Sequence, residues 1–202
     1  MTRRFHLPSL GGAQAAILHR PHVTVQALTR QLAAIGLQVS QQWPNLGAAA
    51  LAADFVFFDA DLGHDEQFPW KPGTAPMPMI ALIGSEAPGR IEWALNQGAD
   101  AQLIKPVGDS GVYSALLIAQ QAFEARREQA VQIAGLRARL ADRQTVVRAV
   151  VLLAARGRSE ADAYGQLRQL AMARRETIEQ AAHRVVAQYS QGGDRDDRSE
   201  RS

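Results

Sequence analysis

Arginines are the residues most able to do chemistry in this 202-residue sequence, and they gather in its second half. Residues 126–184 contain 12 arginines and no lysine against 6 acidic residues, a net charge of +6. Residues 1–111 contain 7 basic and 9 acidic residues, a net charge of −2. Because a guanidinium offers several donors to phosphate and a flat face to unpaired bases, this asymmetry favours a polyanion as the partner of the second half. The alternative interpretation is that these arginines only solvate ordinary helices.

Other residue types form no catalytic or metal-binding pattern. His64, Asp65 and Glu66 are consecutive in a segment rich in glycine and proline, which is more typical of a solvated turn than of a metal site. No serine lies in a G-x-S-x-G context, and there is no P-loop or dinucleotide fingerprint. Cysteine is absent, which excludes disulfides and thiolate ligands. We therefore expect a protein that is not an enzyme and that holds no cofactor or metal.

Hydropathy gives no sign of export or of a membrane segment. The first 20 residues include basic side chains but lack the apolar stretch of a signal peptide. No run approaches the ~18 consecutive apolar residues that a membrane span requires. We expect a soluble, cytoplasmic protein without membrane contacts.

Short apolar segments alternate with helical patterns over the first 110 residues. The expected strands lie within 15–19, 37–43, 54–60, 79–84 and 100–106, and the expected helices are 23–36 and 90–99. Residues 62–78 hold two glycines and four prolines and should form a loop where the alternation calls for a helix. Strands that alternate with helices predict an α/β fold with a parallel sheet covered on both faces.

One long helical pattern begins at Val112 and ends near Ala155. Apolar residues occupy its a and d heptad positions, with Arg143 as an interruption: Ile133, Leu136, Leu140, Val147 and Val150. This spacing predicts a short coiled coil over 112–150 that joins two copies of the chain. An amphipathic helix packed on its own domain is the alternative.

Two shorter helices should follow. Gly157 interrupts the long helix, and Ser159 with Asp162 provides the cap of a helix that ends near Ala173. Another helix spans roughly 176–189. The expected core consists of Leu152, Ala163, Leu167, Leu170, Ile178, Ala182 and Val185, with Tyr164 and Met172 also assigned to it. Residues 1–12 should form an N-terminal tail, and the charged residues 191–202 a disordered one.

The spacing of residues over 149–186 points to a known family. The matching positions are Leu152, Leu153, Gly157, Ser159, Glu160, Ala163, Tyr164, Leu167, Arg168, Ala171, Met172, Ile178 and Ala182. With them the segment resembles the ANTAR domain, a three-helix RNA-binding module of bacterial antiterminators. One departure is that the family usually has Ala-Lys where this sequence has Arg148 and Ala149. On a helix this moves the basic group by about 100°.

The first half resembles a CheY-like, flavodoxin-like receiver domain. The run GADAQLIKP matches the last receiver strand with its lysine, here Lys105, and Asp59 falls where the phosphoacceptor would lie. Receivers hold Mg²⁺ with two acids after the first strand, because a hard cation needs oxygen ligands. This sequence has His19 and Arg20 there. Asp59 is therefore expected to be a vestigial phosphoacceptor in a pseudo-receiver.

A second receiver position is also altered. The Thr or Ser that receivers carry after the fourth strand falls nearest to Ile83 or Gly84, with Ser85 close by.

The order of the segments is that of the aliphatic amidase regulators: receiver-like domain 13–111, coiled coil 112–150 and ANTAR domain 143–190. This resemblance implies a dimeric antitermination regulator that binds hairpin loops in leader RNA. It also implies control by a ligand-sensing partner of the periplasmic-binding-protein type, in place of phosphorylation. The candidate RNA contacts are Arg148, Arg156, Arg158, Arg168, Arg174 and Arg175. A DNA-binding response regulator and an adaptor that acts through its coiled coil remain alternatives.

Overall fold

The computed structural model describes residues 10–155 and 157–199. The chain divides after Glu128 into two compact units, each described by itself below.

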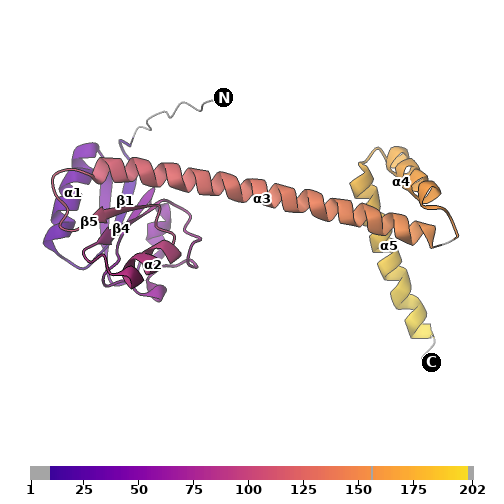
Figure 1. Ribbon diagram of the computed structural model, residues 1–202, viewed down its shortest axis with the longest axis horizontal. Coiled ribbons are helices and arrows are strands. Elements are labelled where there is room, and N and C mark those ends of the chain that lie inside the picture. Colours follow the sequence, from indigo (N-terminus) through magenta and orange to yellow (C-terminus); the bar gives the residue numbers. More distant parts are fainter. Residues whose placement is uncertain (1–9, 156, 200–202) are drawn as a thin grey trace. The chain divides into compact units, whose positions relative to one another are not determined.

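The first unit contains a five-stranded parallel sheet with the strand order β2-β1-β3-β4-β5 (Figure 1). Its elements are β1 (Gln14–Leu18), α1 (Val23–Ile35), β2 (Gln38–Gln42), η1 (Ala48–Ala52), β3 (Phe55–Asp59), η2 (Asp65–Gln67), β4 (Met79–Ile83), α2 (Pro88–Asn96) and β5 (Ala101–Ile104). Every predicted strand and helix of this unit is confirmed, with ends within three residues. This strand order is that of CheY and flavodoxin, and its switch point lies between β1 and β3.

Two of the three interior strands, β3 and β4, are buried along their whole length. Helix α1 and the start of α3 (Val112–Ala154) cover one face of the sheet, with Leu28 and Leu116 packed in the same cluster as Phe57. Helix α2 and the loop that precedes β4 cover the other face, where Phe68 and Ala94 pack with Phe58. Burial on both faces explains why these strands read as continuous apolar runs.

The segment 62–78 is a loop, as predicted. It contains only the short 3-10 helix η2, and its side chain Phe68 is buried against the sheet. A second 3-10 helix, η1, joins β2 to β3 and was not expected from the sequence.

Helix α3 (Val112–Ala154) passes through both units. Its first two turns bury Val112, Leu116 and Ala119 against the sheet, so the first unit continues beyond the expected boundary at Gly111. Further along, Arg126 Nη2 donates to both carboxylate oxygens of the buried Asp100, at 3.0 and 3.1 Å. The start of α3 is therefore an integral part of the receiver-like fold.

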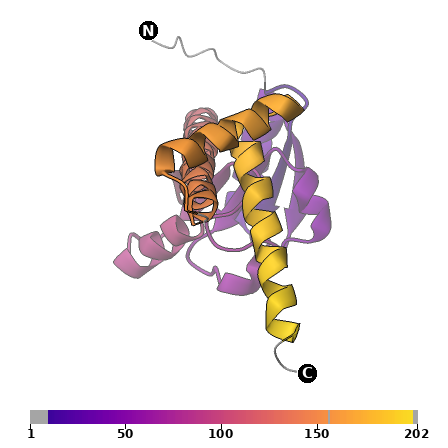
Figure 2. The same ribbon diagram turned by 90° about the vertical axis from the view of Figure 1, so that its right-hand side faces the viewer.

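The second unit packs the end of α3 against α4 (Glu160–Arg174) and α5 (Ile178–Ser199) (Figure 2, where α3 is seen end-on). The core contains many small side chains: Ala149, Leu153, Ala163, Leu167, Ala171, Ala181, Ala182 and Val185. Four residues that were assigned to this core lie outside it: Leu170, Tyr164 and Met172 are exposed, and Leu152 is absent from the cluster.

Both predicted tails differ from the structure. Leu10 is buried in the sheet core, and Gly12 N–H donates to Gly36 O, so residues 10–12 belong to the fold. Residues 1–9 lie outside the described part of the chain. At the other end, α5 continues to Ser199 through the residues expected to be disordered. No proline interrupts that stretch, and the backbone hydrogen bonds of a helix are internal to it.

Candidate nucleic-acid interface and receiver pocket

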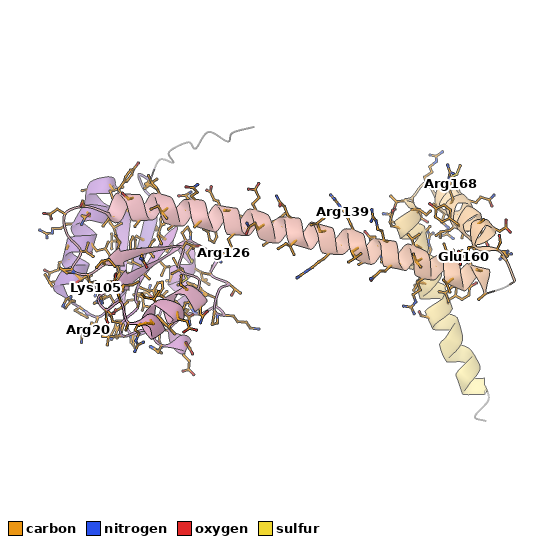
Figure 3. The ribbon with its side chains drawn as sticks, viewed as in Figure 1. Arg20, Lys105, Arg126, Arg139, Glu160 and Arg168 are labelled. Atoms are coloured by element: carbon orange, nitrogen blue, oxygen red, sulfur yellow. The ribbon has the colours of Figure 1, made fainter. Side chains whose placement is uncertain are left out.

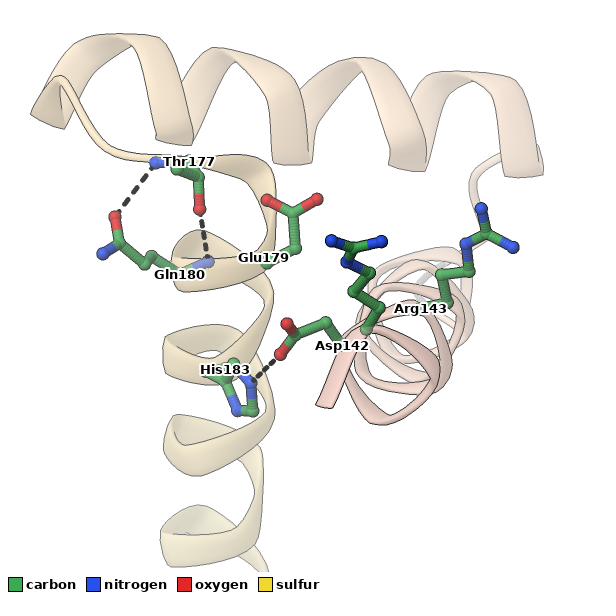
Figure 4. A pocket seen from close by; sticks show the side chains of 7 residues that line it. Asp142, Arg143, Thr177, Glu179, Gln180 and His183 are labelled. Carbon is green, nitrogen blue, oxygen red and sulfur yellow. Dashed lines mark hydrogen bonds and ion pairs between the residues drawn. The ribbon is translucent and has the colours of Figure 1, made fainter. Parts of the chain in front are cut away.

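Side-chain caps define where the two short helices of the second unit begin. Ser159 Oγ accepts a hydrogen bond from Asp162 N–H at 3.1 Å at the start of α4, as the sequence predicted. At the start of α5, Thr177 and Gln180 form a reciprocal capping box, in which each side chain accepts from the other's backbone N–H (Figure 4). The cap at Ser159 holds the start of α4, the helix that carries Arg168 and Arg174.

The candidate arginines that the structure describes are all exposed: Arg148 on α3, Arg158 before α4, Arg168 and Arg174 in α4, and Arg175 at its end (Figure 3 shows Arg168). Arg156 lies outside the described residues.

Nearby carboxylates do not neutralise these arginines. Asp162 accepts from the Ser159 hydroxyl at 2.7 Å, and Glu176 forms an ion pair with Arg184, which is not a candidate. Within residues 10–155 and 157–199, none of the five described candidates forms an ion pair. Their charge is therefore available to a partner.

Helix α4 presents a stripe that the sequence analysis misassigned. Tyr164 and Met172 were expected in the core, and both are exposed. The buried positions are Ala163, Leu167 and Ala171, one residue earlier in each case. Exposed Tyr164, Arg168 and Met172 consequently follow one another at i, i+4 spacing. The sequence shows two adjacent rows on this helix, one of large side chains and one of small or apolar side chains. The helices that pack against α4 decide which of the two rows is buried.

A surface hollow of about 450 Å³ lies between α3 and α5 and was not foreseen. His183 Nε2 lies 3.2 Å from Asp142 Oδ1 at its wall, and Arg139 and Arg143 also line it (Figure 4). Residues about 40 positions apart meet here, so no local pattern could reveal the site.

The middle of α3 exposes an apolar row. Ile133, Leu136, Leu140 and Val147 are all exposed, as a coiled-coil seam in a single chain would be. Val150 is the exception, because it packs partly against the core of the second unit. Val151, which is exposed, continues the row in its place.

The predicted receiver residues meet at the carboxyl ends of β1, β3 and β5. Asp59 is only 2% exposed, and Lys105 Nζ donates to its Oδ1 at 2.7 Å. His19, also 2% exposed, places Nε2 3.3 Å from Asp59 Oδ2, without the alignment of a hydrogen bond. Both carboxylate oxygens of Asp59 therefore face positive or polar groups of the chain itself.

A second carboxylate, Asp61, shares this site and was missed by the sequence analysis. Its Oδ2 accepts from Lys105 Nζ at 2.6 Å and from Gly84 N–H at 2.8 Å, while its Oδ1 accepts from Ser85 N–H at 3.0 Å. Burial raises the pKa of Asp61, but the hydrogen bonds from Lys105, Ser85 and Gly84 outweigh it and hold the pKa below its usual range. Asp61 is thus a stable anion.

The adjoining hollow, of about 400 Å³, is lined by His19, Arg20, His22, Thr24, Asp59, Asp61, Leu62, Lys105 and Pro106. No group of three or more histidines and acids in the described part of the chain has the arrangement of a metal site. Basic side chains stand where receivers carry the acids that hold Mg²⁺.

Comparison with protein families decides the relationship. The family model described as "AmiR, N-terminal" matches residues 13–120, more than half of the chain. The chain belongs to the AmiR family. The model described as "ANTAR domain" matches residues 134–186 of this AmiR-family protein. It is therefore a transcription regulator of the response-regulator type, with the domains of an antitermination factor.

Several solved structures similar to this AmiR-family chain are receiver domains. One is a CheY-like receiver from Methanospirillum hungatei JF-1, with 20% identity, 58% of this chain and 99% of that chain covered, and a TM-score of 0.43. Another is a CheY-like response regulator from Mesorhizobium loti, with 19% identity, coverage of 52% and 96%, and a TM-score of 0.40. A third is the receiver of a modulated diguanylate cyclase from Desulfovibrio desulfuricans G20, with 16% identity, coverage of 57% and 98%, and a TM-score of 0.44.

A search of curated proteins finds no match to this chain. Among its described helices, none is both long and apolar enough to cross a membrane.

Proposed function

We propose that this AmiR-family protein is a cytoplasmic antitermination regulator that binds hairpin loops of a leader RNA as a dimer. The observation that carries the proposal is the set of exposed arginines without ion-pair partners, within the described residues of a unit that the ANTAR model matches. Antitermination requires a protein that stabilises one RNA fold over a competing terminator hairpin. A loop offers unpaired bases and a backbone rich in phosphate, both of which arginine can bind.

The stripe on α4 supports recognition of bases. Tyr164 offers an aromatic face on which an unpaired base can stack, and Arg168 lies one helical turn further along. Met172 extends the same stripe as an adaptable apolar surface. The basic groups around this stripe supply the phosphate contacts that make binding dependent on salt concentration.

Arg175 supports the proposal through its backbone. It ends α4 in the left-handed region, with φ 54° and ψ 42°, and it is the only residue other than glycine with positive φ in the described part of the chain. Glycine is the usual residue at such a helix end, because a Cβ is strained there. A strained position that retains a charged, exposed side chain is typical of a residue used in binding.

The partner that we assign to the exposed apolar row of α3 is the same row on a second copy of the chain. Ile133, Leu136, Leu140 and Val147 recur at heptad spacing, which matches the same row on an identical helix. Each copy then contributes one C-terminal unit. Two linked weak sites gain avidity of about 10²–10⁴ over one, provided that the RNA presents two loops.

Control would not pass through phosphorylation. Asp59 is buried, and His19 and Arg20 follow β1 where receivers carry the two acids that hold Mg²⁺. Following the family resemblance, we assign control to a ligand-sensing partner of the periplasmic-binding-protein type, which sequesters the regulator until an inducer binds.

DNA binding is the second candidate, and one observation favours it. Only Arg175, Glu176 and Thr177 join α4 to α5, a connection as short as in a helix-turn-helix. In that motif the first turns of the second helix read the DNA. Here the first turn of α5 carries Glu179, and its Arg184 is paired with Glu176, so α5 is a poor recognition helix.

A gel-shift comparison tests the proposal. The probes are the RNA transcribed from upstream of the protein's own operon, the same RNA with altered loop sequences, and duplex DNA of the same sequence. We expect a shift with the native RNA that weakens when the loops are altered, and little binding to the duplex. Stronger binding to the duplex would favour a DNA-binding regulator, and binding to no probe would favour an adaptor.

A further inference from the structure

The carboxylate of Asp61 is bound as an external anion would be. Three donors from two segments converge on it: Lys105 after β5 and the backbone N–H groups of Gly84 and Ser85 after β4. In an open parallel sheet, ligands bind outside the carboxyl ends of the strands, and this is where the donors meet. We propose that the Asp61 carboxylate is a built-in anion of this receiver-like unit. It occupies the donors that the oxygens of a phosphoryl group on Asp59 would need, so no external phosphoryl group can bind there.

The space around Gly84 is an independent observation for this assignment. A Cβ added at Gly84 would lie 2.7 Å from Asp61 Oδ2 and 3.1 Å from Lys105 Cε. Glycine is thus the residue that lets the Asp61 carboxylate approach the β4 end. Gly84 is one of the two positions nearest to the Thr or Ser of receivers, and the space that a side chain would need there is taken by Asp61.

Asp61 is also tied to the vestigial phosphoacceptor. Its backbone N–H donates to Asp59 Oδ1 at 3.0 Å, and Lys105 Nζ contacts both carboxylates. Lys105 is mostly buried, and its ammonium group already contacts two carboxylates. These neutralise its charge, so it does not attract a further anion. Groups of the chain itself therefore link the ends of β3, β4 and β5.

This arrangement gives the proposed independence from phosphorylation a structural cause. Its regulatory meaning rests on the proposed function, but the contact between Asp61 and Gly84 does not depend on RNA. The test below follows the first unit only, so its result is separate from that of the gel shift.

A double-mutant cycle on the full chain tests the contact. Trp43, Trp70 and Trp93 are the only tryptophans of the sequence and all lie in the first unit, so their fluorescence reports its thermal unfolding. Gly84→Ala should lower the midpoint by about 5 °C in the native background, because the new Cβ displaces the Asp61 carboxylate. In an Asp61→Ala background the same change should have little effect, since nothing remains to be displaced. If Gly84→Ala lowered the unfolding midpoint equally in the native and the Asp61→Ala background, the proposal would be overturned.

Asp54→Ala is the matched control. Asp54 Oδ2 also accepts a backbone N–H, that of Gln14 at 2.8 Å, but Asp54 precedes β3 and so lies at the opposite end of the strand from Asp61. When Asp54→Ala is combined with Gly84→Ala, the two decreases in the unfolding midpoint should add.

A measurement on the native chain covers the case in which a variant fails to fold. The amide resonances of Gly84 and Ser85 should be unchanged when beryllium fluoride, a phosphoryl mimic, is added with Mg²⁺. A saturable shift of these two resonances would show that an external anion displaces Asp61 and would overturn the proposal.

Discussion

At Arg175, stability and the proposed binding role oppose each other. Its left-handed backbone costs a residue with a Cβ roughly 1 kcal/mol relative to glycine. We expect Arg175→Gly to raise the free energy of unfolding by about 0.5–1 kcal/mol and to weaken RNA binding at the same time. Urea denaturation followed by circular dichroism, together with filter binding, measures both effects. A more stable variant with unchanged RNA affinity would remove Arg175 from the interface.

Asp59 is expected to resist phosphorylation. Acetyl phosphate with Mg²⁺ should leave the native chain unmodified in intact-mass measurements, because Asp59 is buried and His19 and Arg20 replace the acids that would bind the metal. An ordinary CheY-like receiver serves as the positive control. A stable gain of one phosphoryl group that Asp59→Asn abolishes would contradict this prediction.

At the scale of elements, the exposed row of α3 predicts the oligomeric state. Leu136→Asp should convert a dimer to a monomer in light scattering at micromolar concentration, because it puts a charge into the helix-helix seam. Val131→Asp is the matched control: Val131 is 67% exposed and Leu136 62%, but Val131 lies about 140° away around the helix. Dissociation by both substitutions, or a monomeric native chain, would argue against this seam.

At the scale of the whole molecule, charge reversal separates the RNA interface from general electrostatics. Arg168→Glu and Arg174→Glu should each abolish or strongly weaken binding to the twin-hairpin leader while leaving the circular dichroism spectrum unchanged. Arg30→Glu changes the net charge equally on the exposed surface of α1 and should have little effect. A solvated arginine contributes only about 0–1 kcal/mol through a surface ion pair, so a large loss indicates contact with RNA.

Filter binding at two salt concentrations then identifies the kind of contact. Loss of a phosphate contact weakens binding to all RNAs and reduces the salt dependence, whereas loss of a base contact relaxes the preference for loop sequence. If neither Arg168→Glu nor Arg174→Glu changed the affinity for RNA, this part of α4 would not belong to the interface. Arg148 and Arg158 would then be the next candidates.

Local pattern was enough to predict most elements of this protein. Apolar runs such as MIALIG identify strands because burial on both faces requires continuous hydrophobicity. Ser159 and Gly157 mark helix ends because each supplies local geometry or a local hydrogen bond. The ANTAR and receiver resemblances rest on the same kind of short-range spacing, and the family models confirm them.

The sequence by itself thus determined the order of the elements, the two domain families and the excess of arginine in the second half. Only the tertiary structure decided which row of α4 is buried, because Ala163 and Tyr164 are adjacent and the partner helices select between them. Only it revealed Asp61, whose three donors follow two different strands and meet through sheet register. Contacts between residues distant in sequence depend on how elements pack, and no local spacing encodes that.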